Sequence, residues 1–430
     1  MSMRADCHFP TCRAFELGGV MTRLTPADLG ELRDAVNEAL AAEEPIELVA
    51  GETKRALGRP LQVPRTLDLS ALAGIRDYRP SELVLTAGAA TRLDEIDAAL
   101  AQARQMLAFE PPDWAGLFAL PASAATRETL GGVLACNLSG PRRIKAGAAR
   151  DHFLGFRGVS GRGEVFKAGG KVVKNVTGYD LCKLMAGSYG TLAALEEVTV
   201  KVLPRPEAAC TVMLCGLEPA AAVQRLKRAL ASPHEISGAA YLPGFLAAPP
   251  TPHPGLPGVA ALRLEGPPLS VTFRREQLLT ELASDCQAVV LEAESSAVFW
   301  RSIRDVVPLS QPIDRVVWRV SIAPNRGAEL GEAIARALDA NWYLDWGGGL
   351  LWAAVAGAED GGAAVIRGAV RGPDGRGTGH ATLIRGSPAL RRAVPVFEPQ
   401  PPQLAALAGR IKQSFDPRRV LNPGRMVEGS

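Results

Sequence analysis

Short apolar segments with two different periods alternate along the first hundred residues. A stripe at helical spacing follows TPAD (25–28) and consists of Leu29, Leu32, Val36 and Leu40. In TPAD, Thr25 is the expected helix cap, Pro26 suits the first turn and Asp28 completes a capping-box pattern. A second stripe follows Thr91 and consists of Leu93, Ile96 and Leu100. With strands expected at 46–50, 66–69 and 83–87, this region predicts a small α-β-β-β-α unit.

The segment 171–206 contains a short helix followed by a strand. The helix is predicted from the spacing of Leu181, Leu184 and Met185, and it is expected to end at Gly187. The strand is predicted to be half-buried, because polar residues alternate with Val198, Val200 and Val202. Proline at 204 and 206 ends it. Just upstream, GRG at 161–163 predicts the turn of a hairpin.

After Pro206 helices and strands alternate in a way that is typical of an α+β domain. Strands are expected at 211–214, 259–264, 288–292, 316–322, 342–346 and 350–354, and helices at 220–230, 270–283, 298–305 and 328–338. Val223, Leu226 and Leu230 are expected to face inward, and 241–268 is expected to be a long loop around one strand. The alternation predicts an antiparallel sheet with helices on one face. A last helix at 403–414 places Leu404, Leu407 and Ile411 on one side.

Composition removes several classes of protein from consideration. The chain has 430 residues, of which 47% are apolar, and its net charge is only +3, which gives no reason to expect nucleic acid as a partner. Its seven cysteines are dispersed without a CxxC motif, so neither a disulfide framework nor an iron–sulfur cluster is expected. No apolar run is long enough to span a bilayer. Residues 1–20 do not resemble a signal peptide and are expected to be a disordered tail, with a start at Met21 as an alternative.

Two glycine-rich stretches are the strongest candidates for a ligand site. The first is TLGGVLACNLSGPRR at 129–143, and the second is GSYG at 187–190. Backbone N–H groups in glycine-rich turns can form an anion-binding nest, although such glycines can also simply turn corners between strands. Two such stretches followed by a strand favour the ligand site. No GxGxxG motif joins a strand to a helix, so the region does not predict a Rossmann domain.

Longer motifs give the chain a specific resemblance. These are GRP (58–60), QML (105–107), EPP (110–112), GG (131–132), GPRR (140–143), RD (150–151), KNVTGYDL (174–181), GSYGTL (187–192), KVLPRP (201–206), DWGG (345–348), GHAT (379–382) and NPGRM (422–426). With them, the chain from about Leu24 to Met426 resembles the vanillyl-alcohol-oxidase/p-cresol-methylhydroxylase flavoprotein superfamily. Within it, the chain is most similar to the FAD-binding E-type subunits of bacterial glycolate oxidases.

The resemblance implies an α+β fold: a two-part FAD-binding domain of the vanillyl-alcohol-oxidase type and an α+β cap domain with an antiparallel sheet. The expected limits are 21–206 for the FAD-binding domain and 207–395 for the cap. Residues 396–430 are expected to return to the FAD-binding domain. The stretch 131–140 would hold the pyrophosphate and ribityl chain of FAD, and 187–192 would pass close to the isoalloxazine ring.

The expected cofactor-binding residues are Gly51, Thr53, Lys54, Arg55, Thr129, Gly131, Gly132, Ala135, Asn137, Ser139, Gly140, Asn175, Gly178, Tyr179, Gly187, Ser188, Gly190, Thr191, Leu192 and Asn422. Lys54 and Arg55 could offer charge to the pyrophosphate or belong to a solvated loop, and Tyr179 and Asp180 could be purely structural. Since the first phosphate loop, 52–60, contains neither the His nor the Cys that links flavin covalently in this superfamily, noncovalent FAD is expected.

His380 is the one candidate for a catalytic base, because it lies in GTGHAT near the expected junction of cap and flavin. A lone histidine is more often structural, as His152 beside the second loop could also be. The histidine-rich HxGDGN metal motif of related hydroxy-acid dehydrogenases is absent from the sequence, so no metal is expected.

The resemblance implies an FAD-binding subunit of a complex that oxidises glycolate to glyoxylate. Its partners would be a catalytic FAD subunit and an iron–sulfur subunit, and its own flavin would relay electrons or shape the complex. It would be cytoplasmic and reach the inner face of the membrane only through these partners. Two alternatives remain open: a free-standing FAD-dependent dehydrogenase for a 2-hydroxy acid such as D-lactate, and a scaffold without flavin.

Overall fold

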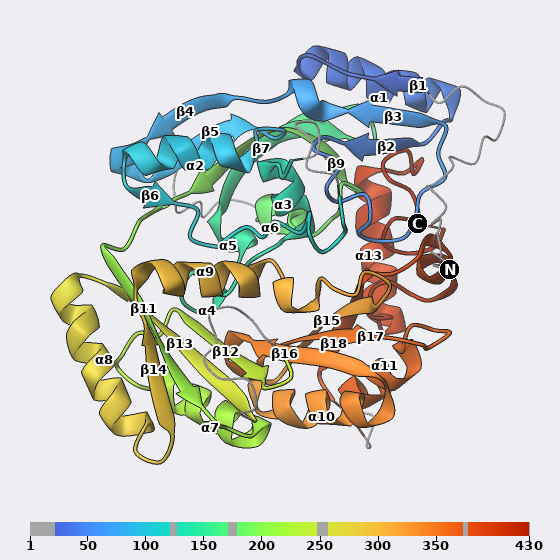
Figure 1. Cartoon of the computed structure of the whole chain (residues 1–430). Helices are drawn as coiled ribbons and strands as arrows, with labels where there is room; N and C mark the ends of the chain where they lie inside the picture. Colours follow the sequence, from blue (N-terminus) through green and yellow to red (C-terminus); the bar gives the residue numbers. More distant parts are fainter. Residues whose placement is uncertain (1–21, 121–126, 171–178, 247–256, 373–376, 430) are drawn as a thin grey trace, which may run out of the picture.

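The computed structural model describes residues 22–120, 127–170, 179–246, 257–372 and 377–429 and arranges them in two halves, one above the other in Figure 1. Residues 1–20, Asn175 and Gly178, which figure among the sequence-based expectations, lie outside the described residues. The mixed architecture with antiparallel sheets confirms the predicted α+β class.

The chain begins with a three-stranded parallel sheet covered by one helix. Its order is β1–β3–β2, with β1 Thr22–Leu24, β2 Ile46–Val49 and β3 Arg65–Asp68, and α1 Leu29–Ala42 packs on it through Leu32 and Val36. The predicted cap was wrong. Asp28, not Thr25, caps α1: its carboxylate accepts from the N–H of Glu31 at 2.9 Å, while Glu31 accepts in turn from the N–H of Ala27. Strand β1 was not predicted.

A five-stranded antiparallel sheet follows, in the order β4–β5–β9–β7–β8. Its strands are β4 Ile75–Arg79, β5 Val84–Gly88, β7 Phe153–Ser160, β8 Val165–Gly169 and β9 Ala193–Lys201. The hairpin of β7 and β8 confirms the GRG turn. Strand β9 is central and buried on both faces, so the half-buried prediction was wrong. Its polar Thr199 is satisfied by a hydrogen bond of 2.9 Å to the hydroxyl of Thr86 on β5.

Helices and one small strand pair complete this half. The helices are α2 Leu93–Gln102, α3 Leu130–Cys136, α4 Arg143–Ala146, α5 Ala149–His152 and α6 Leu181–Met185, and β6 Gln105–Met106 pairs with β10 Leu203–Pro204. The glycine-rich stretch at 131–136 is therefore helix α3 and not the predicted turn. Thr129 caps it, and its Leu130, Val133 and Leu134 are fully buried.

The second half is built on an eight-stranded antiparallel sheet in the order β14–β11–β13–β12–β16–β17–β15–β18. The strands are β11 Ala208–Cys215, β12 Gly238–Pro243, β13 Gly258–Gly266, β14 Gln287–Leu291, β15 Val316–Ile322, β16 Ala340–Asp345, β17 Leu350–Val355 and β18 Gly379–Arg385. Strand β12 was not predicted and extends into the start of the region expected to be a long loop, and β18 was also not predicted.

Helices cover both faces of this sheet, although helices on one face only were expected. On the outer face lie α7 Pro219–Leu230, α8 Pro268–Leu282, α10 Gly327–Ala337 and α11 Ala363–Arg371, the last of them unpredicted. Helix α9 Ala293–Arg304 lies on the other face, between the two halves (Figure 1), where Phe299 and Ile303 join the core shared with the first half. Leu230 is 38% exposed, so it does not face inward as expected.

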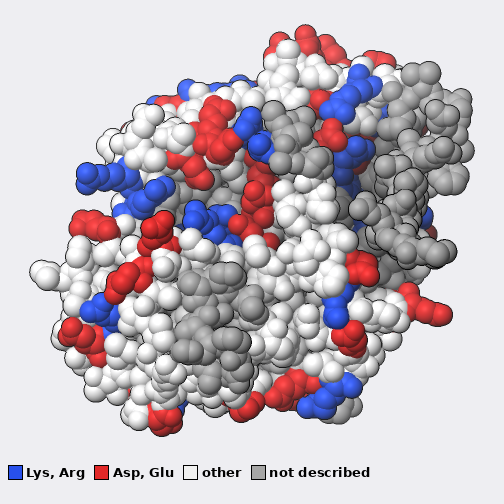
Figure 2. Space-filling model, in the orientation of Figure 1, with Lys and Arg blue, Asp and Glu red and all other residues white. Residues whose placement is uncertain are grey.

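After α12 Pro388–Ala393 the chain returns to the first half through α13 Pro402–Phe415, at the right of Figure 1. The stripe predicted on this helix is not a core face, because Leu404 and Leu407 are exposed. Lys412 anchors the helix: its ammonium donates to the carbonyl of Thr191 at 2.8 Å and pairs with Asp416 at 2.7 Å. The following segment reaches strand β2, where Leu421 bridges to Ile46. On the face shown in Figure 2, charged side chains of both signs are interspersed.

Candidate functional site: a cleft in the first half

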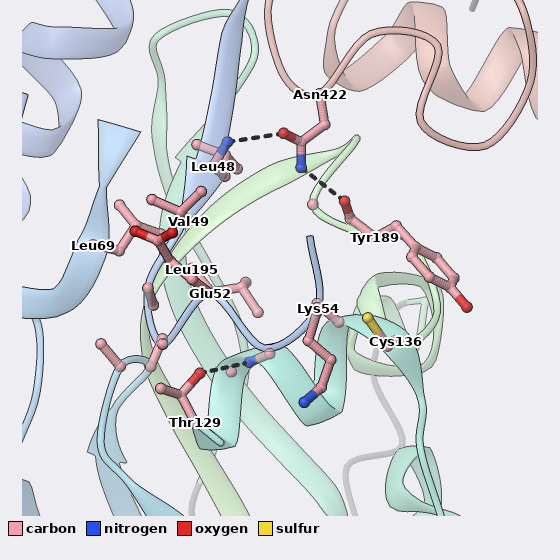
Figure 3. A pocket seen from close by; sticks show the side chains of 18 of the residues that line it. Leu48, Val49, Glu52, Lys54, Leu69, Thr129, Cys136, Tyr189, Leu195 and Asn422 are labelled. Atoms are coloured by element: carbon pink, nitrogen blue, oxygen red, sulfur yellow. Dashed lines mark hydrogen bonds between the residues drawn. The ribbon is translucent and has the colours of Figure 1, made fainter. Parts of the chain in front are cut away.

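A cleft lies where β2, α3, β9 and the C-terminal segment meet (Figure 3). Its lining is mostly apolar and small, with a few polar side chains, which is typical of pockets for flat organic cofactors. The lining residues are Leu48, Val49, Ala50, Gly51, Glu52, Thr53, Lys54, Arg55, Leu69, Ala89, Ala90, Thr129, Gly131, Gly132, Ala135, Cys136, Tyr189, Gly190, Ala193, Leu195, Asn422 and Arg425.

The loop after β2 forms one wall and carries two basic residues with different surroundings. Arg55 is held by two acids, pairing with Glu47 and, at 3.2 Å, with Glu52. Lys54 lies against α3 in Figure 3, with its ammonium 3.0 Å from the hydroxyl of Thr53 and paired with Glu128. Both basic residues are thus paired with acids, Arg55 with two and Lys54 with one.

The first turn of α3 forms the floor, and its two glycines serve different ends. The hydroxyl of Thr129 accepts from the N–H of Gly132 at 3.3 Å. A Cβ on Gly131 would lie 2.7 Å from the carbonyl oxygen of Ala89, so this glycine lets α3 pack closely on the chain after β5. A Cβ on Gly132 would lie 3.0 Å from the hydroxyl of Thr129 and 3.8 Å from Lys54 Cγ, in the space of the cleft. The first N–H groups of α3 donate within the chain, so this helix start offers a cofactor space at Gly132 and not free donors.

The opposite wall is fixed by Asn422 on the C-terminal segment. Its side-chain oxygen accepts from the N–H of Leu48 at 2.8 Å, and its amide nitrogen donates to the carbonyl of Tyr189 at 2.9 Å (Figure 3). Tyr189 and Gly190 both have positive φ, +53° and +69°, which turns the chain sharply beside the cleft. Asn422 thus joins β2 to the GSYG turn.

Arg425 closes the same wall from the C-terminal segment. Its guanidinium donates at 3.1 Å to the carbonyls of Arg55 and Leu57 and pairs at 3.1 Å with Glu47. The NPGRM motif is therefore part of the wall of the cleft and not ordinary terminal packing.

The expected cofactor residues fall into two groups in space. Those that line the cleft are Gly51, Thr53, Lys54, Arg55, Thr129, Gly131, Gly132, Ala135, Gly190 and Asn422. Those that do not are Asn137, Ser139, Gly140, Tyr179, Gly187, Ser188, Thr191 and Leu192. Several of the second group have structural partners: Asn137 and Ser139 accept from backbone N–H groups of α5, and Leu192 is in the core. Tyr179 is 96% exposed.

Some lining residues were missed by the sequence analysis, among them Ala89, Ala90, Cys136, Tyr189 and Arg425. Tyr189 and Arg425 lie inside motifs that were recognised, so those motifs could have indicated them. Cys136 brings a thiol into the cleft, although the first phosphate loop contains none. Burial raises the pKa of Cys136 to about 11, which keeps the thiol protonated and a weak nucleophile at neutral pH.

The two histidines of interest have different surroundings. His152 is fully buried, and its ring nitrogens contact the carbonyls of Ala146 at 2.8 Å and Lys201 at 3.2 Å, which is a structural role. His380 is exposed on β18, opposite Ser321 of β15, and its imidazole makes no hydrogen bond to another described residue. Within the described ranges no group of three His, Cys, Asp or Glu side chains could hold a metal ion. No described helix is both long and apolar enough to cross a membrane.

The fit to FAD is supported by the open side of Gly132, the small apolar lining and the basic Lys54. Residues 22–169 match the model of the FAD binding domain family. The chain is 33% identical over 395 residues to the glycolate oxidase subunit GlcE of Escherichia coli strain K12, covering 92% of this chain and 96% of that protein. It is 39% identical over 99 residues to the glycolate oxidase subunit GlcD of Bacillus subtilis strain 168, covering 23% of this chain and 21% of the relative.

Among solved structures, p-cresol methylhydroxylase superposes with a TM-score of 0.67 at 13% identity, covering 94% of this chain and 88% of that one. At that identity the likeness shows the fold alone, and it agrees with the two-part architecture described above. Since the similarity to GlcE extends through both halves, the chain belongs to the GlcE family of FAD-linked oxidoreductases.

Proposed function

We propose that this chain is the FAD-holding subunit of a multi-subunit glycolate oxidase, which oxidises glycolate to glyoxylate. The observation that carries the proposal is the similarity to GlcE over nearly the whole length of both proteins. This similarity therefore includes the cap and the C-terminal segment. Bound FAD supplies the redox chemistry. The part of this chain is to hold and orient the cofactor.

The residues divide this task by position. Lys54 would meet the phosphates with its ammonium, because it lies beside the open side of Gly132 at the start of α3. The Tyr189–Gly190 turn and Asn422 would border the rest of the cofactor. FAD would be held without a covalent bond, since the thiol of Cys136 stays protonated at neutral pH.

The role of the subunit in the reaction is accessory, as a relay of electrons or a means of shaping the complex. The sequence has no HxGDGN motif, and exposed His380 has no hydrogen-bonded described partner that would hold it as a base. The proton of the substrate would then be removed in a catalytic FAD subunit, and an iron–sulfur subunit would accept the electrons. Any contact with the membrane would be made through these partners, on its cytoplasmic face.

Dye-linked glycolate turnover tests this function, measured for the purified chain and for the complex purified with its partners. We expect flavin in the isolated chain with little or no turnover, and brisk turnover in the complex that survives His380→Ala. Brisk turnover by the isolated chain that is lost in His380→Ala would instead establish a free-standing 2-hydroxy-acid dehydrogenase. A chain without flavin absorbance in its visible spectrum would be a scaffold.

A further inference from the structure

Two arginines from different halves share one tryptophan ring at the junction of cap and flavin-binding half. The guanidinium carbon of Arg143 on α4 lies 4.3 Å from the centre of the Trp346 ring, and that of Arg319 on β15 lies 5.0 Å from it. Both side chains are half-buried. Two like charges are thus held against a single aromatic side chain, an arrangement that costs energy unless an anion lies near.

No described acidic side chain forms an ion pair or hydrogen bond with either guanidinium. Other buried arginines at this junction are paired: Arg263 with Glu110 at 2.8 Å, and Arg142 with Glu265 at 2.8 Å. Arg319 differs, and burial lowers its pKa to about 10. Asp345 interacts electrostatically with Arg319, but its carboxylate accepts from the N–H of Trp346 at 2.7 Å, and burial raises its pKa to about 7, so it is a weak counter-charge.

The arginine pair lies next to the cleft and on a strained turn. The indole N–H of Trp346 donates to the carbonyl of Gly140 at 3.1 Å, which joins the cap to the chain just after α3. Trp346, Gly347 and Gly348 all have positive φ, +52°, +65° and +100°. A tryptophan in this conformation is uncommon, and such strain is concentrated at functional sites. Arg319 also interacts electrostatically with Tyr189, which lines the cleft.

We propose that Arg143 and Arg319 bind the carboxylate of a small organic acid against the Trp346 ring. Each planar guanidinium can offer two N–H groups to two carboxylate oxygens, and the Trp346 ring holds both guanidiniums in place. The proposal extends the proposed function, because it gives this chain a site of its own for a 2-hydroxy acid or its product beside the flavin cleft.

Calorimetric titration of the FAD-loaded chain with oxalate tests the site. Oxalate has no C–H bond to lose as hydride, so binding is measured without turnover. We expect saturable binding that weakens about tenfold or more in Arg143→Met and in Arg319→Met, the loss of one charge-assisted pair. Arg336→Met, which removes an exposed arginine of α10, should bind oxalate like the wild type. Because the two tested arginines lie on different halves, misfolding of one variant leaves the other informative.

Three results would overturn the proposal. One is the absence of saturable oxalate binding. Another is equally tight binding of inorganic phosphate, which would make the pair a general anion site. The third is a shift of the flavin midpoint potential in Arg319→Met with oxalate affinity unchanged, since the guanidinium would then serve the flavin. Failure of the proposed function is a separate result: the complex would not oxidise glycolate, whatever the oxalate affinity of the chain.

Discussion

Asn422 and Tyr189, which are 233 positions apart in the chain, are joined by a hydrogen bond of 2.9 Å at the wall of the cleft in the first half. The same asparagine side chain also holds the N–H of Leu48. Asn422→Ala leaves both backbone groups without this partner in a buried place, so we expect a loss of about 2 kcal/mol or more in the free energy of unfolding. Flavin content, measured from the visible spectrum, should fall as well.

Asn422→Asp separates the two bonds, because a carboxylate can still accept from Leu48 but cannot donate to Tyr189. Its stability should fall below that of the wild type, because the buried carboxylate would face the carbonyl of Tyr189. Asn37→Ala, at an exposed position on α1, is the matched control and should change neither stability nor flavin content. An unchanged flavin content in Asn422→Ala would show that the cofactor does not depend on this wall.

We expect acid precipitation of the protein to release its yellow flavin into the supernatant as FAD. The reason is that no histidine lies in the first phosphate loop and the thiol of Cys136 is held protonated by burial. Cys136→Ala should therefore keep its flavin content. Flavin that stays with the wild-type pellet but leaves the Cys136→Ala pellet would identify Cys136 as a covalent link and refute noncovalent binding.

Gly132→Val should remove flavin binding while the chain stays folded. The new side chain would enter the cleft from the first turn of α3, close to Lys54, and compete with the cofactor for space. Gly409→Val is the matched control, since this glycine also lies in a helix, α13, but has open space around it. Circular dichroism and flavin absorbance check both variants, and a folded Gly132→Val with full flavin would place the cofactor elsewhere.

Gly190→Val is expected to lose flavin for two reasons together. Its φ of +69° is strained for valine, and the new Cβ would lie 2.8 Å from the amide nitrogen of Asn422. The same measurements apply, but a fall in melting temperature should accompany the loss of flavin. Full flavin content in this variant would contradict our placement of the GSYG turn beside the cofactor.

Stability should depend on pH through Asp345. Burial raises its pKa from 3.8 to about 7, so the folded chain binds more protons than the unfolded chain between these values. The penalty for burying the carboxylate is thus fully present above about pH 7 and disappears as the pH falls towards 4. Asp345→Asn removes this penalty, so its free energy of unfolding should rise relative to that of the wild type. We expect this gain to be about 2 kcal/mol larger at pH 8 than at pH 5.

Urea unfolding of both proteins at the two pH values measures this difference. The control is Asp34→Asn, which makes the same change from aspartate to asparagine at an exposed position on α1. A gap between Asp345→Asn and wild type that is equal at pH 5 and pH 8 would show that Asp345 does not titrate as inferred.

The family and the two-part fold could be predicted because long motifs keep their order along the chain. The prediction of local structure failed where the sequence carries signals for two different structures. In α3 the glycines suggest a turn, yet Leu130, Val133 and Leu134 also have helical spacing, and their burial decides the outcome. Strand β12 borders a region rich in proline and glycine. It is stabilised by pairing along β13, and such pairing between strands cannot be seen in the local sequence.

The candidate site was predictable only in part for a similar reason. Residues within one motif, such as Gly131 and Gly132, can be recognised together because they are adjacent in the sequence. Arg143 and Arg319, in contrast, meet at Trp346 from opposite halves of the molecule, and although Arg143 lies in the GPRR motif, no local pattern links it to Arg319. Only the three-dimensional structure shows that their usual acidic partners are missing among the described residues.

The wall that Asn422 and Arg425 contribute has a consequence for biosynthesis. The other walls of the cleft are made by strands and helices that leave the ribosome hundreds of residues earlier. During translation the first half can assemble its sheets, but its cleft stays open on one side until the segment after α13 arrives. If the cleft holds the flavin as proposed, stable capture of the cofactor is a late event, and we expect a chain released before Asn422 to retain none.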